Sequence, residues 1–197
     1  IEPTPIPPQE PLTSDIAGIA RPVSAWVGRA EDPETIGEQG MAAIAAARVA
    51  PGQVATLILP ANAAWGEGGV VGIAPEIAAP EPVAEEAIEQ AAAMLRRPGS
   101  LLLLGADALL ADSLGLAGDI AAATGCGLLA EGMNKRLQRG AGSVPIDRIP
   151  YPVDQALKLL APYQRIVMVG ARHPAAFFAY PDTPSLVTPP GCVVFAL

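Results

Sequence analysis

The chain has 197 residues, enough for one ordinary domain or for one domain and part of a second. Hydrophobic residues make up 51% of it, which excludes an intrinsically disordered chain, and its apolar runs are far shorter than the roughly 20 residues of a membrane span. The formal charge of -8, from 12 basic and 20 acidic residues, argues against a nucleic-acid partner, because phosphate binding depends on clustered cations.

Five prolines among the first eleven residues block regular structure at the start of the chain. Helices and strands then alternate. The predicted helices are 33–50, 83–97, 109–124 and 153–161, and the predicted strands are 54–59, 101–104, 126–130, 165–170 and 192–197, with an irregular segment at 131–152. Near-continuous apolar strands separated by helices predict an α/β fold, a parallel sheet with helices on both faces, Rossmann-like in its second part.

The proline-rich stretch APEIAAPEP, residues 74–82, has the composition of a linker. Residues 1–73 before it hold one good helix and one good strand, so we expect an incomplete α/β segment and the weaker half of the chain. The strand 54–59 is expected to have unpaired edges there and to favour self-association. Residues 83–197, with three helices and four strands, should fold on their own.

Ligands of such sheets bind beyond the carboxyl ends of the strands. After strand 54–59 the glycines do not form the G-x-G-x-x-G fingerprint, because Val71 stands where the third glycine should be. After strand 101–104 a single glycine, Gly105, precedes Asp107, which favours a tight turn over phosphate binding. The glycines of the first of these loops are Gly66, Gly68, Gly69 and Gly72.

The other two strand ends are more polar. Residues 131–142 supply Asn134, Arg136 and Arg139, for which a solvated loop and a ligand-facing or interdomain role both stay open. Lys135 joins the same basic group. The loop after strand 165–170 carries the only histidine, His173, interpreted as an ordered loop residue because no Ser or Cys lies near it in sequence.

The remaining reactive side chains form no catalytic pattern. Glu85, Glu86 and Glu89 make a charged helix face, and the H-E-x-x-H, G-x-S-x-G and C-x-x-C motifs are absent. Cys126 and Cys192 lack metal-ligand spacing, so we expect two buried thiols in a reducing compartment. The sequence therefore predicts no catalytic, cofactor-binding or metal-binding residue.

The order of the segments resembles a family. Residues 21–65, RPVSAW through PANAAW, resemble the end of the pyrimidine-binding domain of thiamine diphosphate-dependent enzymes of the acetolactate synthase type. Residues 83–197 resemble their central domain, most specifically in IPYPVDQAL and GARHPAAFFAYP. The same resemblance implies that this domain is cut short at its C-terminal end. The resemblance spans about Pro11 to Leu197 and assigns the loop after Pro60 to the passage from one domain to the next.

The resemblance implies a parent enzyme that acts on 2-keto acids by carboligation or decarboxylation with thiamine diphosphate and Mg2+. The family's Gly-Asp-Gly metal segment is not matched, since Ile120 follows Gly118 and Asp119, and Asn134 comes without the expected second Asn. We therefore expect that this chain alone binds neither cofactor, is inactive, and supplies structural and interdomain parts. FAD is not expected. The expected partners are the parent's remaining domains and further copies in a homo-oligomer, without nucleic acid or membrane. The expected location is the cytoplasm. The alternative functions are a nucleotide-binding module and a non-catalytic scaffold.

Overall fold

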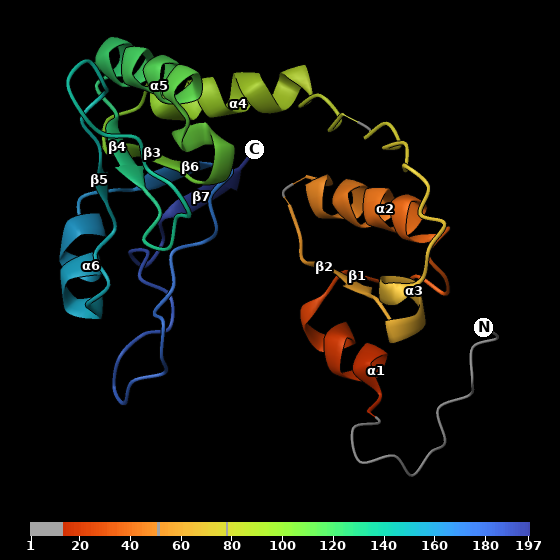
Figure 1. The fold of residues 1–197 in the computed structure, drawn as a ribbon. Helices are drawn as coiled ribbons and strands as arrows, with labels where there is room; N and C mark the ends of the chain where they lie inside the picture. Colours follow the sequence, from red (N-terminus) through yellow and green to blue (C-terminus); the bar gives the residue numbers. More distant parts are fainter. Residues whose placement is uncertain (1–13, 51, 78) are drawn as a thin grey trace. The chain divides into compact units, whose positions relative to one another are not determined.

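The computed structural model describes residues 14–50, 52–77 and 79–197, so the proline-rich start lies outside the described residues. The chain divides into two compact units, Ile1–Glu81 and Pro82–Leu197, drawn in Figure 1. The division falls at the end of the segment 74–82 whose composition predicts a linker. None of the described helices has the length and apolar character needed to cross a bilayer.

The first unit is built on two parallel strands, β1 (Trp26–Arg29) and β2 (Ala55–Ile58), paired from Trp26 opposite Ala55 to Arg29 opposite Ile58. Helix α2 connects them and packs on both, while α1 and α3 lie on the other side of the strands (Figure 1). The bounds of its helices are α1 Ile16–Ala20, the 3-10 turn Arg21–Val23, α2 Ile36–Arg48 and α3 Ala61–Trp65.

This unit holds more structure than the sequence predicts. The strand expected at 54–59 is paired along one edge by β1, so the expectation of unpaired edges is wrong on that side. The chain after Pro60 first forms α3 before it runs on toward the second unit. Helix α2 begins at Ile36 instead of residue 33, because residues 33–35 form a turn closed by the Asp32 carboxylate, which accepts the backbone N–H of Thr35 at 2.9 Å.

The second unit contains a five-stranded sheet in the order β5-β4-β3-β6-β7, and every pairing is parallel. Its strands are β3 Ser100–Leu104, β4 Gly127–Ala130, β5 Asp147–Arg148, β6 Arg165–Val169 and β7 Val193–Ala196. Its helices are α4 Glu85–Leu95, the 3-10 turn Ala106–Leu109, α5 Ala111–Thr124 and α6 Val153–Leu160. The predicted α/β fold with a parallel sheet is confirmed.

Strand β3 explains why the apolar runs show no alternation. Leu102 and Leu104 pack in the core under α4 and α5, whereas Leu101 and Leu103 pack in the core on the side of α6. Because helices cover both faces, every residue of β3 is buried. Its first residue, Ser100, is 2% exposed, and its Oγ lies 2.7 Å from the carbonyl oxygens of Met94 and Arg97 at the end of α4.

Three details of this unit correct the sequence analysis. Strand β5 lies inside the segment expected to be irregular, which makes five strands instead of four. The helix expected from 109 starts at Ala111, after a separate 3-10 turn. Cys126 is buried, but Cys192 is only partly buried, because it precedes the edge strand β7.

Candidate functional site

The candidate site of the second unit is the carboxyl edge of its sheet, between β3 and β6. From β3 the chain crosses to β4 on one side, and from β6 it continues to β7 on the other. The connections thus diverge at this point, which is where ligands bind in open parallel sheets.

Two glycines bring the backbones of β3 and β6 close together at this edge. The N–H of Gly105 donates to the carbonyl oxygen of Val169 at 3.0 Å. A Cβ on Gly170, whose φ is +62°, would lie 2.7 Å from the carbonyl oxygen of Gly105, and a Cβ on Gly105 would lie 2.5 Å from that of Gly170. Gly105 therefore allows the close approach of the two strand ends, and the 3-10 turn Ala106–Leu109 follows it.

Glu131 lies against Gly105 at this edge of the sheet. It follows β4 directly, and its N–H extends the ladder by donating to the carbonyl of Leu104 at 2.9 Å. Its Oε2 accepts the backbone N–H of Arg172 at 3.0 Å, and its Cδ lies 2.9 Å from the place that a Cβ on Gly105 would take. One carboxylate thus joins the ends of β4, β3 and β6.

A cavity of about 360 Å³ adjoins Glu131. Its walls are largely apolar and include Tyr151, Phe177 and Val187, and His173 lies at its rim, exposed to solvent. The ring centroids of Tyr151 and Phe177 are 5.6 Å apart. Desolvation, reinforced by the neighbouring Tyr180 hydroxyl, raises the pKa of the Tyr151 phenol. The cavity has the character of a binding pocket for a planar or apolar group.

A catalytic histidine would need a nucleophile or an orienting carboxylate within hydrogen-bond reach. Among the side-chain hydrogen bonds of the described residues, none involves His173, so its placement gives it no such partner. Glu131 is not among the residues predicted from the sequence, where its one local signal is an acidic residue directly after the strand.

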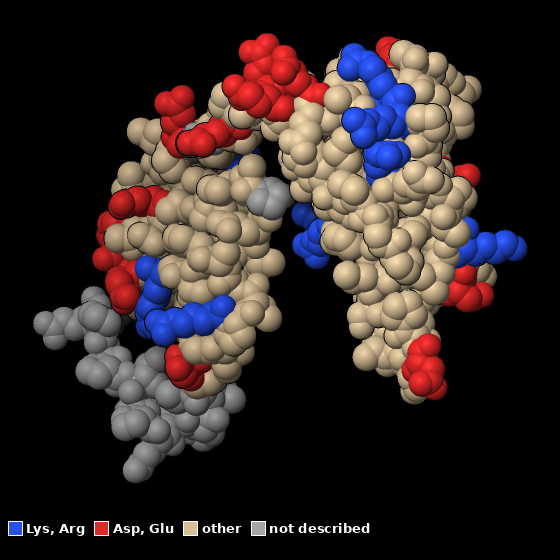
Figure 2. Space-filling model, turned by 180° about the vertical axis from the view of Figure 1, so that it is seen from behind, with Lys and Arg blue, Asp and Glu red and all other residues tan. Residues whose placement is uncertain are grey.

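The basic group of the 131–142 segment lies on the surface. Lys135, Arg136 and Arg139 are exposed, and the Asn134 side chain donates to the backbone carbonyl of Glu131 at 2.8 Å, closing a turn. On the face drawn in Figure 2 the basic side chains form small separate groups, while acidic side chains gather over the start of α4. Glu85, on that helix, is exposed.

The glycine-rich loop of the first unit serves packing. A Cβ on Gly72 would collide with the carbonyl oxygen of Gly37, and one on Gly37 would collide with that of Val70. The chain at 70–72 therefore runs against the first turn of α2, at a distance that only glycine allows. Gly37 and Gly72 therefore allow the two stretches of backbone to cross in contact.

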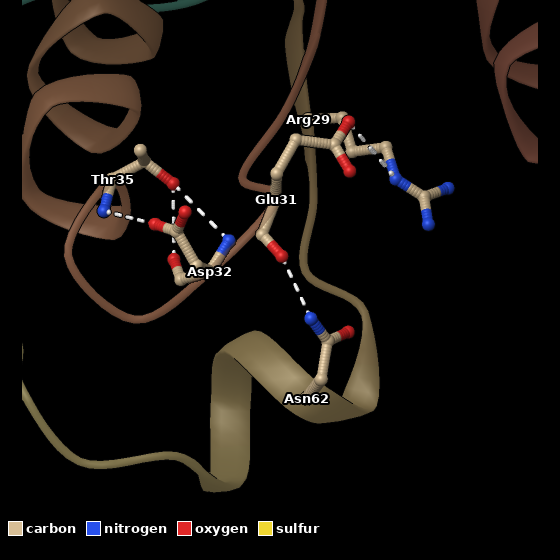
Figure 3. A network of polar contacts seen from close by, with 5 residues as sticks. All are labelled: Arg29, Glu31, Asp32, Thr35 and Asn62. Carbon is tan, nitrogen blue, oxygen red and sulfur yellow. Dashed lines mark hydrogen bonds and ion pairs between the residues drawn. The ribbon is translucent and has the colours of Figure 1, made fainter. Parts of the chain in front are cut away.

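Figure 3 shows a polar network where β1 ends and α3 begins. The Asn62 side chain donates to the backbone carbonyl of Glu31 at 2.7 Å, and the Glu31 carboxylate lies 3.5 Å from Nε of Arg29. Asp32 and Thr35 exchange backbone and side-chain hydrogen bonds beside it. The groups are exposed and bonded to one another, so the network fixes the loops of the first unit.

The described residues do not fit the Mg2+ and diphosphate of thiamine diphosphate. No three His, Cys, Asp or Glu side chains in the described part of the chain gather as metal ligands would. Asp119 lies in the middle of α5 and is exposed, on a helix surface instead of a metal-binding loop. We therefore derive no step of a reaction from these residues.

Comparisons with known proteins place this architecture in a class. No family model matches the chain. Three solved structures share its fold: a thiamin diphosphate-dependent enzyme of Mycobacterium smegmatis (TM-score 0.64, 20% identity), the 4-hydroxybenzoylformate decarboxylase of Rhodococcus jostii (0.68, 16%) and the benzoylformate decarboxylase of Polynucleobacter necessarius (0.61, 22%). They match 92%, 93% and 95% of this chain, which covers 35% of each of them.

A relative found by sequence is more similar. The chain is 40% identical over 190 residues to a Mycobacterium tuberculosis protein named as an acetolactate synthase large subunit, IlvX. The match takes in 95% of this chain and 36% of the relative, so the chain spans about a third of the length of the proteins it matches. The resemblance to thiamine diphosphate-dependent enzymes of the acetolactate synthase type is confirmed.

Proposed function

We propose that this chain is a segment of a thiamine diphosphate-dependent enzyme that acts on 2-keto acids, by carboligation or decarboxylation. The observation that carries the proposal is the 40% identity with the acetolactate synthase-type relative across 95% of the chain. In enzymes of this class the cofactor supplies the chemistry, and the protein supplies binding and orientation.

The role proposed for this chain is structural and interdomain. Residues 1–73 are proposed as the end of a pyrimidine-binding domain, 74–82 as a linker and 83–197 as a central domain. The thiamine diphosphate and Mg2+ of the parent would be held by residues outside this chain, which alone would be inactive. The covered parallel sheet and the lack of a metal-ligand cluster among the described residues support this role.

The same proposal extends to partners and location. The remaining domains of the parent and further copies of it are the proposed partners, without nucleic acid or membrane. A cytoplasmic location is supported by Cys126 and Cys192, which are both free cysteines, as expected in a reducing compartment.

A nucleotide-binding module is the second candidate, favoured by the 360 Å³ cavity at the carboxyl edge of the sheet. The two candidates differ in what they predict for the parent. A keto-acid enzyme consumes its substrate only when thiamine diphosphate is present. A nucleotide-binding module consumes no keto acid, with or without thiamine diphosphate.

The test is an assay of the longer parent protein with a panel of 2-keto acids that includes pyruvate and benzoylformate. We expect CO2 release that requires both thiamine diphosphate and Mg2+. The 197-residue chain, assayed beside it, should release none. A folded parent that consumes no keto acid of the panel with the cofactor present would overturn the proposal.

A further inference from the structure

The position of Glu131 carries an inference that goes beyond the proposed function. We propose that the Glu131 carboxylate is a built-in anion, which occupies the space at the ends of β3, β4 and β6 and keeps phosphate-bearing ligands away from this edge of the sheet.

Glu131 takes up a backbone N–H donor that a phosphate would otherwise use. Backbone N–H groups in the loops after parallel strands are the usual donors to a phosphate at this edge of a sheet. In this chain the N–H of Arg172, two residues after Gly170, donates to Oε2 of Glu131 at 3.0 Å. A hydrogen bond from an N–H to a carboxylate is charge-assisted, as a bond to a phosphate would be.

Glu131 also occupies the space that a phosphate would need. The Glu131 carboxyl carbon lies 2.9 Å from the point where a Cβ on Gly105 would stand. The side chain therefore fills the room left above the glycine at the end of β3. A phosphate could reach the same N–H only by displacing Glu131, and it would meet a like charge on the way.

The groups around the Glu131 carboxylate suit a nucleotide. Arg172 and His173 also border the 360 Å³ cavity, and Tyr151 and Phe177 line its apolar part. A free N–H donor, a cationic side chain and a pocket for a planar ring are the parts from which a nucleotide site is assembled. Removing the carboxylate should convert this edge into such a site.

The experiment compares ADP binding by the wild-type chain, Glu131→Ala, Glu131→Gln and the control Glu89→Ala. Glu89 is exposed on α4, so its replacement changes the net charge equally without touching the surroundings of Glu131. Binding is measured by titration calorimetry and by the shift of the melting temperature. Adenosine and pyrophosphate are tested separately, to divide ring binding from phosphate binding.

We expect ADP and pyrophosphate to bind Glu131→Ala at least about tenfold more tightly than the wild type. Glu131→Gln should gain less than Glu131→Ala, because the amide fills the same space and can accept the same N–H but carries no charge that repels the phosphate. The difference in adenosine affinity between the variants and the wild type should be no larger than the difference in ADP affinity.

A folded Glu131→Ala chain that binds ADP and pyrophosphate no better than the wild type would overturn the proposal. So would equal gains in Glu131→Ala and Glu89→Ala. If Glu131→Ala is unfolded by itself, millimolar pyrophosphate should restore its circular dichroism, and a chain that stays unfolded would count against the proposal. No keto acid or thiamine diphosphate enters these measurements, so failure here leaves the proposed function standing.

Discussion

Replacing Gly170 with Ala should destabilise the second unit by about 2–5 kcal/mol. The residue has a φ of +62°, and the left-handed conformation costs an L-residue with a side chain roughly 1–2 kcal/mol. The new Cβ would also stand 2.7 Å from the backbone carbonyl oxygen of Gly105, which directly follows β3. Forced packing of this kind costs about 1–3 kcal/mol.

A matched control separates the two contributions. Gly125 ends α5 with a φ of +70°, and a Cβ there would meet nothing within 4 Å. Gly125→Ala should therefore lose only the conformational part, about 1–2 kcal/mol. The difference between the two variants measures the close approach of β3 and β6.

The assay can follow each unit separately by urea unfolding. All three tyrosines, Tyr151, Tyr163 and Tyr180, lie in the second unit, and both tryptophans, Trp26 and Trp65, lie in the first. Second-derivative tyrosine absorbance thus reports the second unit, and tryptophan fluorescence reports the first. Equal free-energy losses in Gly170→Ala and Gly125→Ala would refute the argument that the two strand ends touch.

Three further changes test the packing and the electrostatics. Leu103→Ala, at a fully buried position, should cost about 2–5 kcal/mol by the tyrosine signal, whereas Leu116→Ala, 66% exposed, should stay within about 0.5 kcal/mol; equal costs would contradict the described core. Asn62→Ala should lose about 1 kcal/mol in the tryptophan transition through its bond to the Glu31 carbonyl, and an unchanged transition would show that this bond stabilises nothing. Desolvation, partly offset by Arg165, raises the pKa of the Cys192 thiol above its ordinary 9.0, so above that pH the folded chain keeps a proton that the unfolded chain releases. The free energy of unfolding in urea should therefore fall as pH rises above 9.0. Cys192→Ala should remove part of that fall, and a pH profile identical to that of the wild type would contradict this reasoning.

The apolar strands of the second unit could be predicted from sequence, including the partly exposed edge strand β7, and the short polar strand β5 could not. Strands β3 and β6 are continuous apolar runs because helices or loops cover both of their faces. Strand β5 consists of two exposed residues, Asp147 and Arg148, without any apolar pattern. Strand β1 holds a glycine and ends on Arg29, and its pairing with β2 connects residues 29 positions apart.

The candidate site was predictable in its parts but not in its arrangement. The strand ends at Gly105 and in the 131–142 and 170–181 segments follow from the strand pattern alone. That Glu131 meets Arg172, 41 residues later, follows only from the strand order, which puts β3 between β4 and β6. The glycines after β2 look like a ligand loop in sequence, and their contact with Gly37 depends on the packing of the chain against α2.

The most direct test of the central claim is a calorimetric titration of thiamine diphosphate with Mg2+ into this chain and into its longer parent. The account predicts saturable binding to the parent and none to the 197-residue chain at millimolar cofactor, because the described residues form no site for the metal and the diphosphate. Saturable binding to the chain alone would contradict the claim that its role is structural. A folded parent that binds no thiamine diphosphate would contradict its assignment to this class of enzyme.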